Sequence, residues 1–390
     1  QQGSASRMGI SPDDTNSREK TSVPRRGGQA CLGPLTKVQA RLGLLLYLTL
    51  TVLCVTLSVS SLRIAFYDRL ELPTSDLDLY WAEVKAVSRG ENYYEAAQRE
   101  LRSRGFPTSR VFNWRPPLPM WLLGKLPHPG IAKLALMGIA ATVVLLGAGM
   151  VLHHGSWPAA VVATIALAGA VAPCLLGELY AMPIVWGTAL MALSLLCYGV
   201  DYRLTAVALG ICAACFRELA LPYCLLMLVV ALRYRQRKES LAWVAGLTLF
   251  ALYDGIHVSR VLSLTQADAG TALDATVWLQ MGGLSFLIAC TQMNGLLLLF
   301  TQYVSAVYMC HVVLGAFAWG GEFGLRLKAT LFGFLALFWV VGQPINQYWG
   351  LLLAPPMCLA LARSISALRG LWRAAGYAAD VHCAENLPLR

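Results

Sequence analysis

Acidic, aromatic and basic residues lie close together between residues 76 and 119, after one apolar segment ends and before the next begins. The stretch contains Asp76 and Asp78, Tyr80 four residues after the first of them, and Arg115 directly before two prolines. A carboxylate can take a proton from a hydroxyl group, and a guanidinium can stabilise a departing phosphate. Charged groups beside membrane helices are costly to keep there without a use, so we expect a site in this segment.

The composition of the chain indicates a helical membrane protein. Of its 390 residues, 57% are hydrophobic and only 13% are charged, and the mean hydropathy is +0.57. A soluble domain is closer to half apolar and a quarter charged. Several apolar runs approach the ~20 residues that a membrane-spanning helix needs, whereas a membrane β-barrel would show alternating hydrophobicity. We therefore predict an all-α polytopic membrane protein.

The net charge of +10 has a topological explanation. Lys and Arg lie in short stretches between the apolar runs, most densely from Arg233 to Lys238. Basic residues collect in this way on the cytoplasmic side of membrane proteins. Contacts with anionic lipid headgroups or a lipid phosphate are the remaining use of the charge, and we expect no nucleic acid partner.

The apolar runs predict ten or eleven transmembrane helices with both termini in the cytoplasm. The ten spans cover residues 42–64, 131–152, 158–176, 182–200, 204–216, 219–232, 241–256, 296–319, 328–343 and 348–366. The segment 278–295 would be an eleventh, but we favour a re-entrant or interfacial segment because Arg326 and Lys328 then fall on the cytoplasmic side. The resulting domains are a disordered basic tail (1–40), a transmembrane domain (41–366) with one large outer loop (65–130), and a C-terminal cytoplasmic tail (367–390).

The predicted topology gathers the unusual polar residues at one membrane face, away from the cytoplasm. They are Asp76, Asp78, Tyr80, Arg115, Glu178, Arg217, Glu218, Asp254, His257, Arg260, Gln343, Asn346 and Tyr348. Nucleotide-activated substrates are found mainly in the cytoplasm, and the sequence has no glycine-rich phosphate loop. A transfer reaction at this face therefore needs a donor that is available outside, which favours a lipid-borne one.

Four motifs in the large outer loop carry a resemblance to a known class of enzymes. They are Asp76-Leu-x-x-Tyr80, Gly90, Tyr93-Tyr94 and Arg115-Pro116-Pro117-Leu118. They resemble the first outer loop of GT-C glycosyltransferases and are most similar to that of the polyprenyl-phosphate-mannose-dependent mannosyltransferases of actinobacterial type. Later parts of the pattern are Glu178, Phe216-Arg217-Glu218, Asn346-Gln347-Tyr348-Trp349 and Pro355-Pro356. The chain departs from the family at Trp114-Arg115, where an aromatic residue usually precedes the prolines, so mannose and other hexoses or pentoses stay open as the donor sugar.

The resemblance implies a GT-C-like helix bundle in a bacterial inner (plasma) membrane, with an active site on the non-cytoplasmic face. The sugar would pass from a polyprenyl phosphate to a hydroxyl group of a lipid, glycan or protein acceptor, among membrane lipids. We predict Asp76 as the general base, with Asp78 and Tyr80 as the other catalytic candidates. The predicted substrate-binding residues are Tyr94, Arg115, Glu178, Arg217, Glu218, His257, Arg260, Asn346 and Tyr348. A single in-line displacement would invert the anomeric carbon, whereas a retaining mechanism needs a second, nucleophilic carboxylate.

The pair Asp76 and Asp78 also raises the question of a metal. The two residues form a DxD motif, and hard divalent cations take carboxylate oxygens as ligands. If residues 77–89 form a helix, Asp76 suits its cap position and the two side chains point about 200° apart. The resemblance implies a metal-independent enzyme, so we expect no cofactor, while a divalent metal stays open.

Two other functions compete with sugar transfer. A transporter or flippase for a lipid-linked or anionic solute would carry polar residues through the bilayer midplane. The sequence offers only Gln292, Asn294 and His311 there. A non-catalytic subunit of a larger membrane complex would tolerate the loss of the loop carboxylates. Arg217 and Glu218 could also pair with each other simply to close a helix hairpin.

Overall fold

The computed structural model of the chain describes residues 35–67, 76–177, 179–265 and 280–377. Every regular element in these ranges is an α-helix or a 3-10 helix, and no strand occurs in them. The all-α prediction is therefore confirmed. Most of the predicted N-terminal tail and the candidate residue Glu178 lie outside the described residues.

Among the described residues, five helices are long and apolar enough to cross a membrane. They are α1 (Lys37–Tyr67), α5 (Pro129–His154), α6 (Trp157–Val171, extended by the 3-10 helix η3, Ala172–Cys174), α10 (Arg237–Thr265) and α14 (Gly321–Val340). The chain is therefore a membrane protein. Shorter apolar helices are α7 (Pro183–Gly199), α8 (Arg203–Phe216) and α13 (Gln302–Phe317). The predicted count of ten spans is not confirmed.

Prolines begin several of the apolar helices. α5 starts at Pro129, and the ring of His128 just before it accepts a hydrogen bond from the backbone of the first turn. α7 likewise starts at Pro183. Proline suits the first turn because that position lacks a helical partner for an N–H and the ring holds φ at a helical value. These starts explain why the predicted spans 131–152 and 182–200 agree closely with the observed helices.

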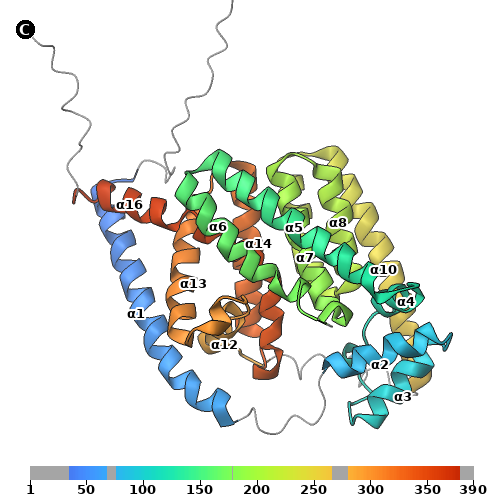
Figure 1. Ribbon diagram of the computed structural model, residues 1–390. Helices are drawn as coiled ribbons and strands as arrows, with labels where there is room; N and C mark the ends of the chain where they lie inside the picture. Colours follow the sequence, from blue (N-terminus) through green and yellow to red (C-terminus); the bar gives the residue numbers. More distant parts are fainter. Residues whose placement is uncertain (1–34, 68–75, 178, 266–279, 378–390) are drawn as a thin grey trace, which may run out of the picture.

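α7 lies at the centre of the longer helices. Most of its side chains are buried, and it packs against α5 and α8. Around it, α13 packs against α1 and α15 (Ala354–Leu361), and α14 packs against α9 (Leu221–Arg233) and α12 (Gly283–Thr291). α1 stands at the edge of this arrangement (Figure 1).

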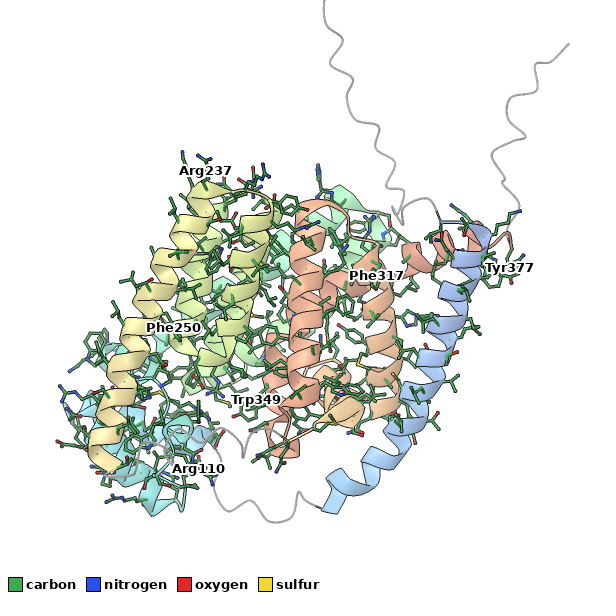
Figure 2. All side chains as sticks on the ribbon, turned by 180° about the vertical axis from the view of Figure 1, so that it is seen from behind. Arg110, Arg237, Phe250, Phe317, Trp349 and Tyr377 are labelled. Carbon is green, nitrogen blue, oxygen red and sulfur yellow. The ribbon has the colours of Figure 1, made fainter. Side chains whose placement is uncertain are left out.

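Three short helices gather at one end of the long ones (Figure 1). They are α2 (Asp76–Ser88), α3 (Tyr93–Ser103) and α4 (Leu118–Lys125). Figure 2 shows Arg110 at this end, whereas Arg237 and Tyr377 lie at the opposite end. Gly90 connects α2 to α3 with a φ of 87°, a left-handed conformation that glycine adopts without strain.

The predicted last span, 348–366, is wrong as a single helix. This stretch contains the 3-10 helix η8 (Pro344–Leu352), then α15, then α16 (Ser364–Ala374). Pro355 and Pro356 explain the break, because neither can donate a backbone hydrogen bond to the turn before it. The boundary drawn at residue 367 for the C-terminal tail falls inside α16. α12 covers only nine residues, about 14 Å, which is too short to span a bilayer.

Arg326 does not lie in a cytoplasmic loop, contrary to the sequence prediction. α14 begins at Gly321, so Arg326 and Lys328 are both within the helix. The Arg326 side chain is fully buried, and it donates to Glu239 at 2.9 Å and to Glu322 at 2.6 Å. The hydropathy pattern predicts that Arg326 lies at the cytoplasmic membrane face. In the fold, the side chain is instead held inside the protein by two carboxylates.

A fourth, partly exposed charge completes this group. Arg203 lies 2.5 Å from Glu322 and 3.4 Å from Glu239. We call Arg203, Glu239, Glu322 and Arg326 the charge network. It joins α8, α10 and α14, and the Arg326 guanidinium also lies 3.7 Å from the ring centre of Tyr198 on α7.

Candidate active site

One face of α2 presents the residues with which the site begins. Asp76, Tyr80 and Glu83 are spaced four and three residues apart, which places them on the same side of the helix. Tyr80 and Glu83 are buried, whereas Asp78 is exposed. Because α2 starts at Asp76, the two carboxylates of the DxD motif diverge within the first turn. The base candidate therefore lies on the buried face and Asp78 does not.

Arg115 is held against α2 by several contacts. Its Nε donates to the Tyr80 hydroxyl at 2.9 Å, and its Nη1 donates to the carbonyl of Phe112 at 3.0 Å. The hydroxyl of Tyr93 on α3 donates to the Arg115 carbonyl at 2.6 Å. Trp114, where the chain departs from the family pattern, is buried and bonds its indole to the carbonyl of Thr108. The guanidinium is thus preorganised rather than free to snorkel to headgroups.

The hairpin predicted around Arg217 is present and brings a second guanidinium to the site. α8 ends at Phe216, the 3-10 helix η5 (Glu218–Ala220) makes the turn, and α9 follows. Arg217 is 3% exposed and donates to Glu218 at 2.8 Å. Glu218 also lies 3.6 Å from Arg115. The two arginines therefore share one carboxylate, and Arg217 Nε has no hydrogen-bond partner among the described residues.

A glycine on α7 makes room for Arg217. A Cβ added at Gly187 would lie 3.0 Å from the Arg217 Cβ, closer than such atoms normally approach. Nearby, Trp186 stacks on Phe216 at 5.4 Å between ring centres and donates its indole N–H to the carbonyl of Tyr180. Tyr180 in turn meets Trp81 of α2 edge-on at 5.1 Å. We call Trp81, Tyr180, Trp186 and Phe216 the aromatic wall; it connects α2 with the turn that carries Arg217.

The C-terminal part of the chain reaches the same place through η8. The Tyr348 hydroxyl donates to Asp76 at 3.2 Å, across 272 residues of sequence. Asn346, two residues earlier, is buried, and its Nδ2 has no partner within the described parts of the chain. Trp349 lies toward the end of the molecule that carries Arg110 (Figure 2). η8 therefore supplies a residue that touches the base candidate.

The structure brings most of the predicted site residues together. Contacts connect Asp76 with Tyr348, Tyr80 with Arg115, and Arg115 through Glu218 with Arg217, and we call these six residues the polar cluster. A second pair is formed by Tyr94 and His257, whose rings stack at 5.8 Å with a hydrogen bond of 3.3 Å. Arg260 lies on the exposed surface of α10 and is not part of the cluster.

Sequence reasoning missed Glu83 and the aromatic wall. Glu83 is 2% exposed, and its Oε2 has no hydrogen-bond partner in the described structure. The signal that could have found it is its position seven residues after Asp76, on the stripe that also carries Tyr80. A glutamate on the buried stripe of a short helix is unusual enough to be singled out.

Burial raises the pKa of Glu83 to about 8. Arg115 and Arg104 oppose this rise, whereas Glu100 and Asp76 add to it. The Glu83 carboxyl group therefore holds its proton at neutral pH. It does not neutralise the positive charge of Arg115. Burial likewise raises the pKa of Tyr80, so its phenol stays protonated and serves as a hydrogen-bonding group.

We expect Glu83 to make the protein less stable as the pH rises. Its pKa is about 8 in the folded chain against an ordinary value of 4.5. Between these values the native state holds a proton that the unfolded state has released. The free energy of unfolding should therefore fall by up to about 1.4 kcal/mol per pH unit and level off above the folded pKa. Thermal unfolding in detergent at pH 5, 7 and 9 measures this, and Glu83→Gln should lack that part of the slope. Parallel profiles for the two proteins would contradict a protonated Glu83.

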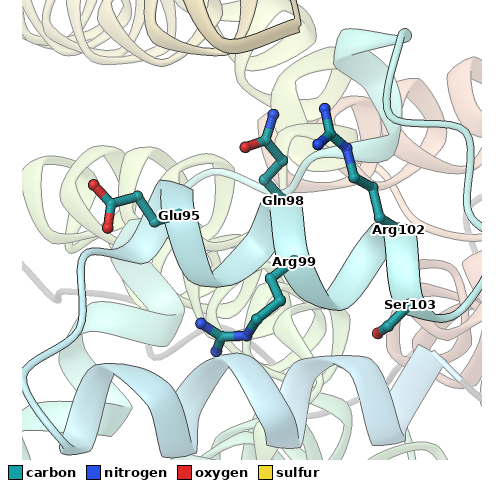
Figure 3. A pocket seen from close by; sticks show the side chains of 5 residues that line it. All are labelled: Glu95, Gln98, Arg99, Arg102 and Ser103. Carbon is teal, nitrogen blue, oxygen red and sulfur yellow. The ribbon is translucent and has the colours of Figure 1, made fainter.

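A surface pocket on α3 does not coincide with the polar cluster. The pocket is open, with a volume of about 500 Å³. Figure 3 shows the side chains that line it, which are Glu95, Gln98, Arg99, Arg102 and Ser103. All five residues belong to one short helix, and Gln98 also bonds to the carbonyl of Leu264 at the end of α10. This is the polar outer side of an amphipathic helix, so it does not add a substrate site.

No protein-family model, curated protein or solved structure matches this chain. A function can therefore be inferred only from the chemistry of the polar cluster. Two guanidinium groups with one carboxylate between them suit a phosphate, since each can donate to anionic oxygens. Asp76 adds a carboxylate that one tyrosine orients. No group of three or more His, Cys, Asp or Glu side chains with the geometry for a metal occurs in the described part of the chain.

Proposed function

We propose that this protein is a membrane glycosyltransferase of GT-C type, which moves a sugar from a polyprenyl phosphate to a hydroxyl acceptor. The observation that carries the proposal is the convergence of Asp76 with Arg115 and Arg217 at one end of apolar helices. A base and a phosphate site within one cluster are the two parts that such a transfer requires. The apolar surface of the helices suits the polyprenyl chain.

In the proposed reaction the acceptor oxygen attacks the anomeric carbon of the donor sugar. The new C–O bond forms while the bond from that carbon to the phosphate oxygen breaks, and polyprenyl phosphate leaves with the electron pair. Asp76 takes the proton from the acceptor hydroxyl, and the hydrogen bond from Tyr348 orients the carboxylate. Arg115 and Arg217 neutralise the charge that develops on the leaving phosphate. One displacement inverts the anomeric configuration.

The remaining site residues have supporting roles in this proposal. Tyr80 positions Arg115 through the 2.9 Å hydrogen bond and does not act as a base, because its phenol stays protonated. Tyr94 and His257 border the cluster as a stacked pair and are placed to contact the sugar or the acceptor. The aromatic wall offers ring faces against which a sugar ring or the first isoprene units can pack.

The proposed orientation puts the polar cluster on the non-cytoplasmic side of a bacterial inner membrane. The densest basic run of the chain, residues 233–238, surrounds the start of α10. Arg237 lies at the end of the molecule opposite Arg110 and the short helices (Figure 2). Basic residues favour the cytoplasmic face, so the opposite end faces outward.

The transporter alternative has less support because its three midplane candidates are engaged in local contacts. Asn294 donates to the carbonyl of Ala166 at 3.0 Å, and Gln292 donates to the carbonyl of Phe300 at 3.0 Å. His311 is within hydrogen-bond distance of the Tyr47 hydroxyl, at 3.2 Å. Side chains that join neighbouring backbone and rings in this way do not form a continuous polar path.

We expect Arg217→Gln to weaken donor binding by about 10- to 100-fold, since a hydrogen bond to a charged group contributes about 1.5–3 kcal/mol. Glutamine is shorter than arginine but keeps a polar, hydrogen-bonding side chain at the turn while removing the charge. Binding of a panel of polyprenyl-phosphate sugars to purified protein in detergent measures the effect, alongside transfer to a soluble hydroxyl acceptor. Arg260→Gln is the matched control, because that arginine lies outside the polar cluster. Equal donor affinity in Arg217→Gln and the parent would overturn the phosphate site.

A further inference from the structure

α16 packs against the first turns of α1 at the end of the molecule opposite the polar cluster (Figure 1). Its buried side carries Ala367 and Leu371, which pack with Ala40 and Leu44 of α1. Hydrophobic residues of α13 complete this small core. α16 is therefore an amphipathic helix fixed to the bundle by one face only.

The other face of α16 combines aromatic and basic side chains. Trp372 and Tyr377 are more than half exposed, and their rings lie 4.9 Å apart. Arg369 and Arg373 are exposed beside them. Neither arginine forms an ion pair within the described residues, and α16 contains no acidic residue.

The beginning of α1 adds two more positive charges to this face. Arg41 donates to the carbonyl of Ala375 at 3.2 Å, and its guanidinium lies 5.5 Å from the ring centre of Tyr377. Lys37 approaches Gly376, where a Cβ would meet its side chain at 3.8 Å. α1 also lacks acidic residues. Four basic side chains therefore lie along α16 and the start of α1, which pack together, and no ion pair to any of them occurs in the described structure.

We propose that this surface binds the headgroup of an anionic phospholipid. The phosphate would lie among Lys37, Arg41, Arg369 and Arg373, with Trp372 and Tyr377 at the depth of the lipid glycerol. The acyl chains would continue along the exposed leucines of the first turns of α1, which are Leu42, Leu45 and Leu46. An amphipathic helix with this combination of side chains is the arrangement that lies in a membrane interface.

A second basic cluster on the same protein carries equal charge in different surroundings. Arg233, Arg235, Arg237 and Lys238 equal the proposed surface in charge and are all exposed. They flank the turn between α9, which ends at Arg233, and α10, which begins at Arg237. This cluster is the matched control, because it carries the same charge at the ends of two apolar helices rather than along an amphipathic one.

Native mass spectrometry of the purified protein tests the proposal. The protein is exchanged into detergent with equal amounts of phosphatidylglycerol and phosphatidylcholine of the same chain length. We expect phosphatidylglycerol to remain bound selectively. Each basic residue should contribute about fivefold to the affinity for the anionic lipid. Combining Arg369→Gln and Arg373→Gln should therefore reduce lipid retention on the order of 30-fold. Combining Arg235→Gln and Arg237→Gln should leave the retention unchanged.

Three outcomes would overturn the proposal. Equal loss in the two double variants would show that net charge alone retains the lipid. Displacement of the lipid by millimolar glycerol phosphate would show a site for a soluble anion. Equal retention of phosphatidylcholine would show that the headgroup charge plays no part. Unchanged thermal unfolding in both double variants confirms that folding is not the cause, and none of these readouts depends on sugar transfer.

Discussion

Replacing Asp76 by asparagine is expected to reduce sugar transfer by about 10²- to 10⁴-fold, which corresponds to about 3–5 kcal/mol in the barrier. Asparagine keeps the size of the side chain and can still cap the start of α2. It can also still accept the hydrogen bond from Tyr348. What it loses is the ability to take a proton from the acceptor. Expression, thermal unfolding and donor affinity should therefore stay close to those of the parent.

Asp78→Asn is the matched control for this prediction, because the same chemical change is made two residues away on the exposed side of α2. Initial rates of transfer with both purified variants at saturating donor decide between the carboxylates. Full activity in Asp76→Asn would remove the base from the mechanism. A loss confined to Asp78→Asn would move the role to that residue.

Arg326→Ala is expected to destabilise the protein by about 3–5 kcal/mol, the usual cost of removing one partner from a buried ion pair. The Arg326 side chain is fully buried, and its loss would remove the 2.9 Å ion pair of Glu239, which is itself 2% exposed and lies 3.4 Å from Arg203. Glu322 would keep its own bond to Arg203. Most of the destabilisation should therefore come from leaving the buried Glu239 carboxylate without its closest positive partner. Thermal or denaturant unfolding in detergent micelles measures it.

Lys328→Ala provides the control within the same helix, since Lys328 only donates to the backbone carbonyl of Trp319. We expect a change below about 1 kcal/mol there. Combining Arg326→Met with Glu239→Gln should recover a large part of the loss, because no charge is then left buried without a partner at that point. A double variant that is as unstable as Arg326→Ala would show that packing, rather than charge, is what Arg326 contributes.

The sequence predicts the apolar helices well where an apolar run coincides with a proline start or a charged turn. α5, α7 and the α8–α9 hairpin are of this kind. It fails where the outcome depends on contacts between distant segments. Hydropathy cannot distinguish a continuous span from η8 followed by α15, because both are equally apolar. It also assigns Arg326 to a loop, because the carboxylate of Glu239 that holds it lies 87 residues earlier.

The candidate site was partly predictable for similar reasons. The four-residue spacing of Asp76 and Tyr80 is local, and the helix that it suggests is present. Tyr348 was included through the predicted topology and the resemblance, since no local pattern indicates that it reaches Asp76. Arg260 is three residues after His257, yet α10 turns it to the exposed side. Glu83 was missed because its burial depends on the packing of α3 and α4 over α2.

The hydrogen bond between Tyr348 and Asp76 has a consequence for biosynthesis. A ribosome delivers Asp76, Tyr80 and Arg115 early, but the residue that orients the carboxylate is delivered only when most of the chain has already been inserted. Nascent chains and products of premature termination before residue 348 would contain the base and the arginines and still lack the completed site. If the protein carries out the proposed sugar transfer, catalytic competence would therefore appear late and abruptly during translation, so that partly inserted chains would not consume the proposed lipid-linked donor.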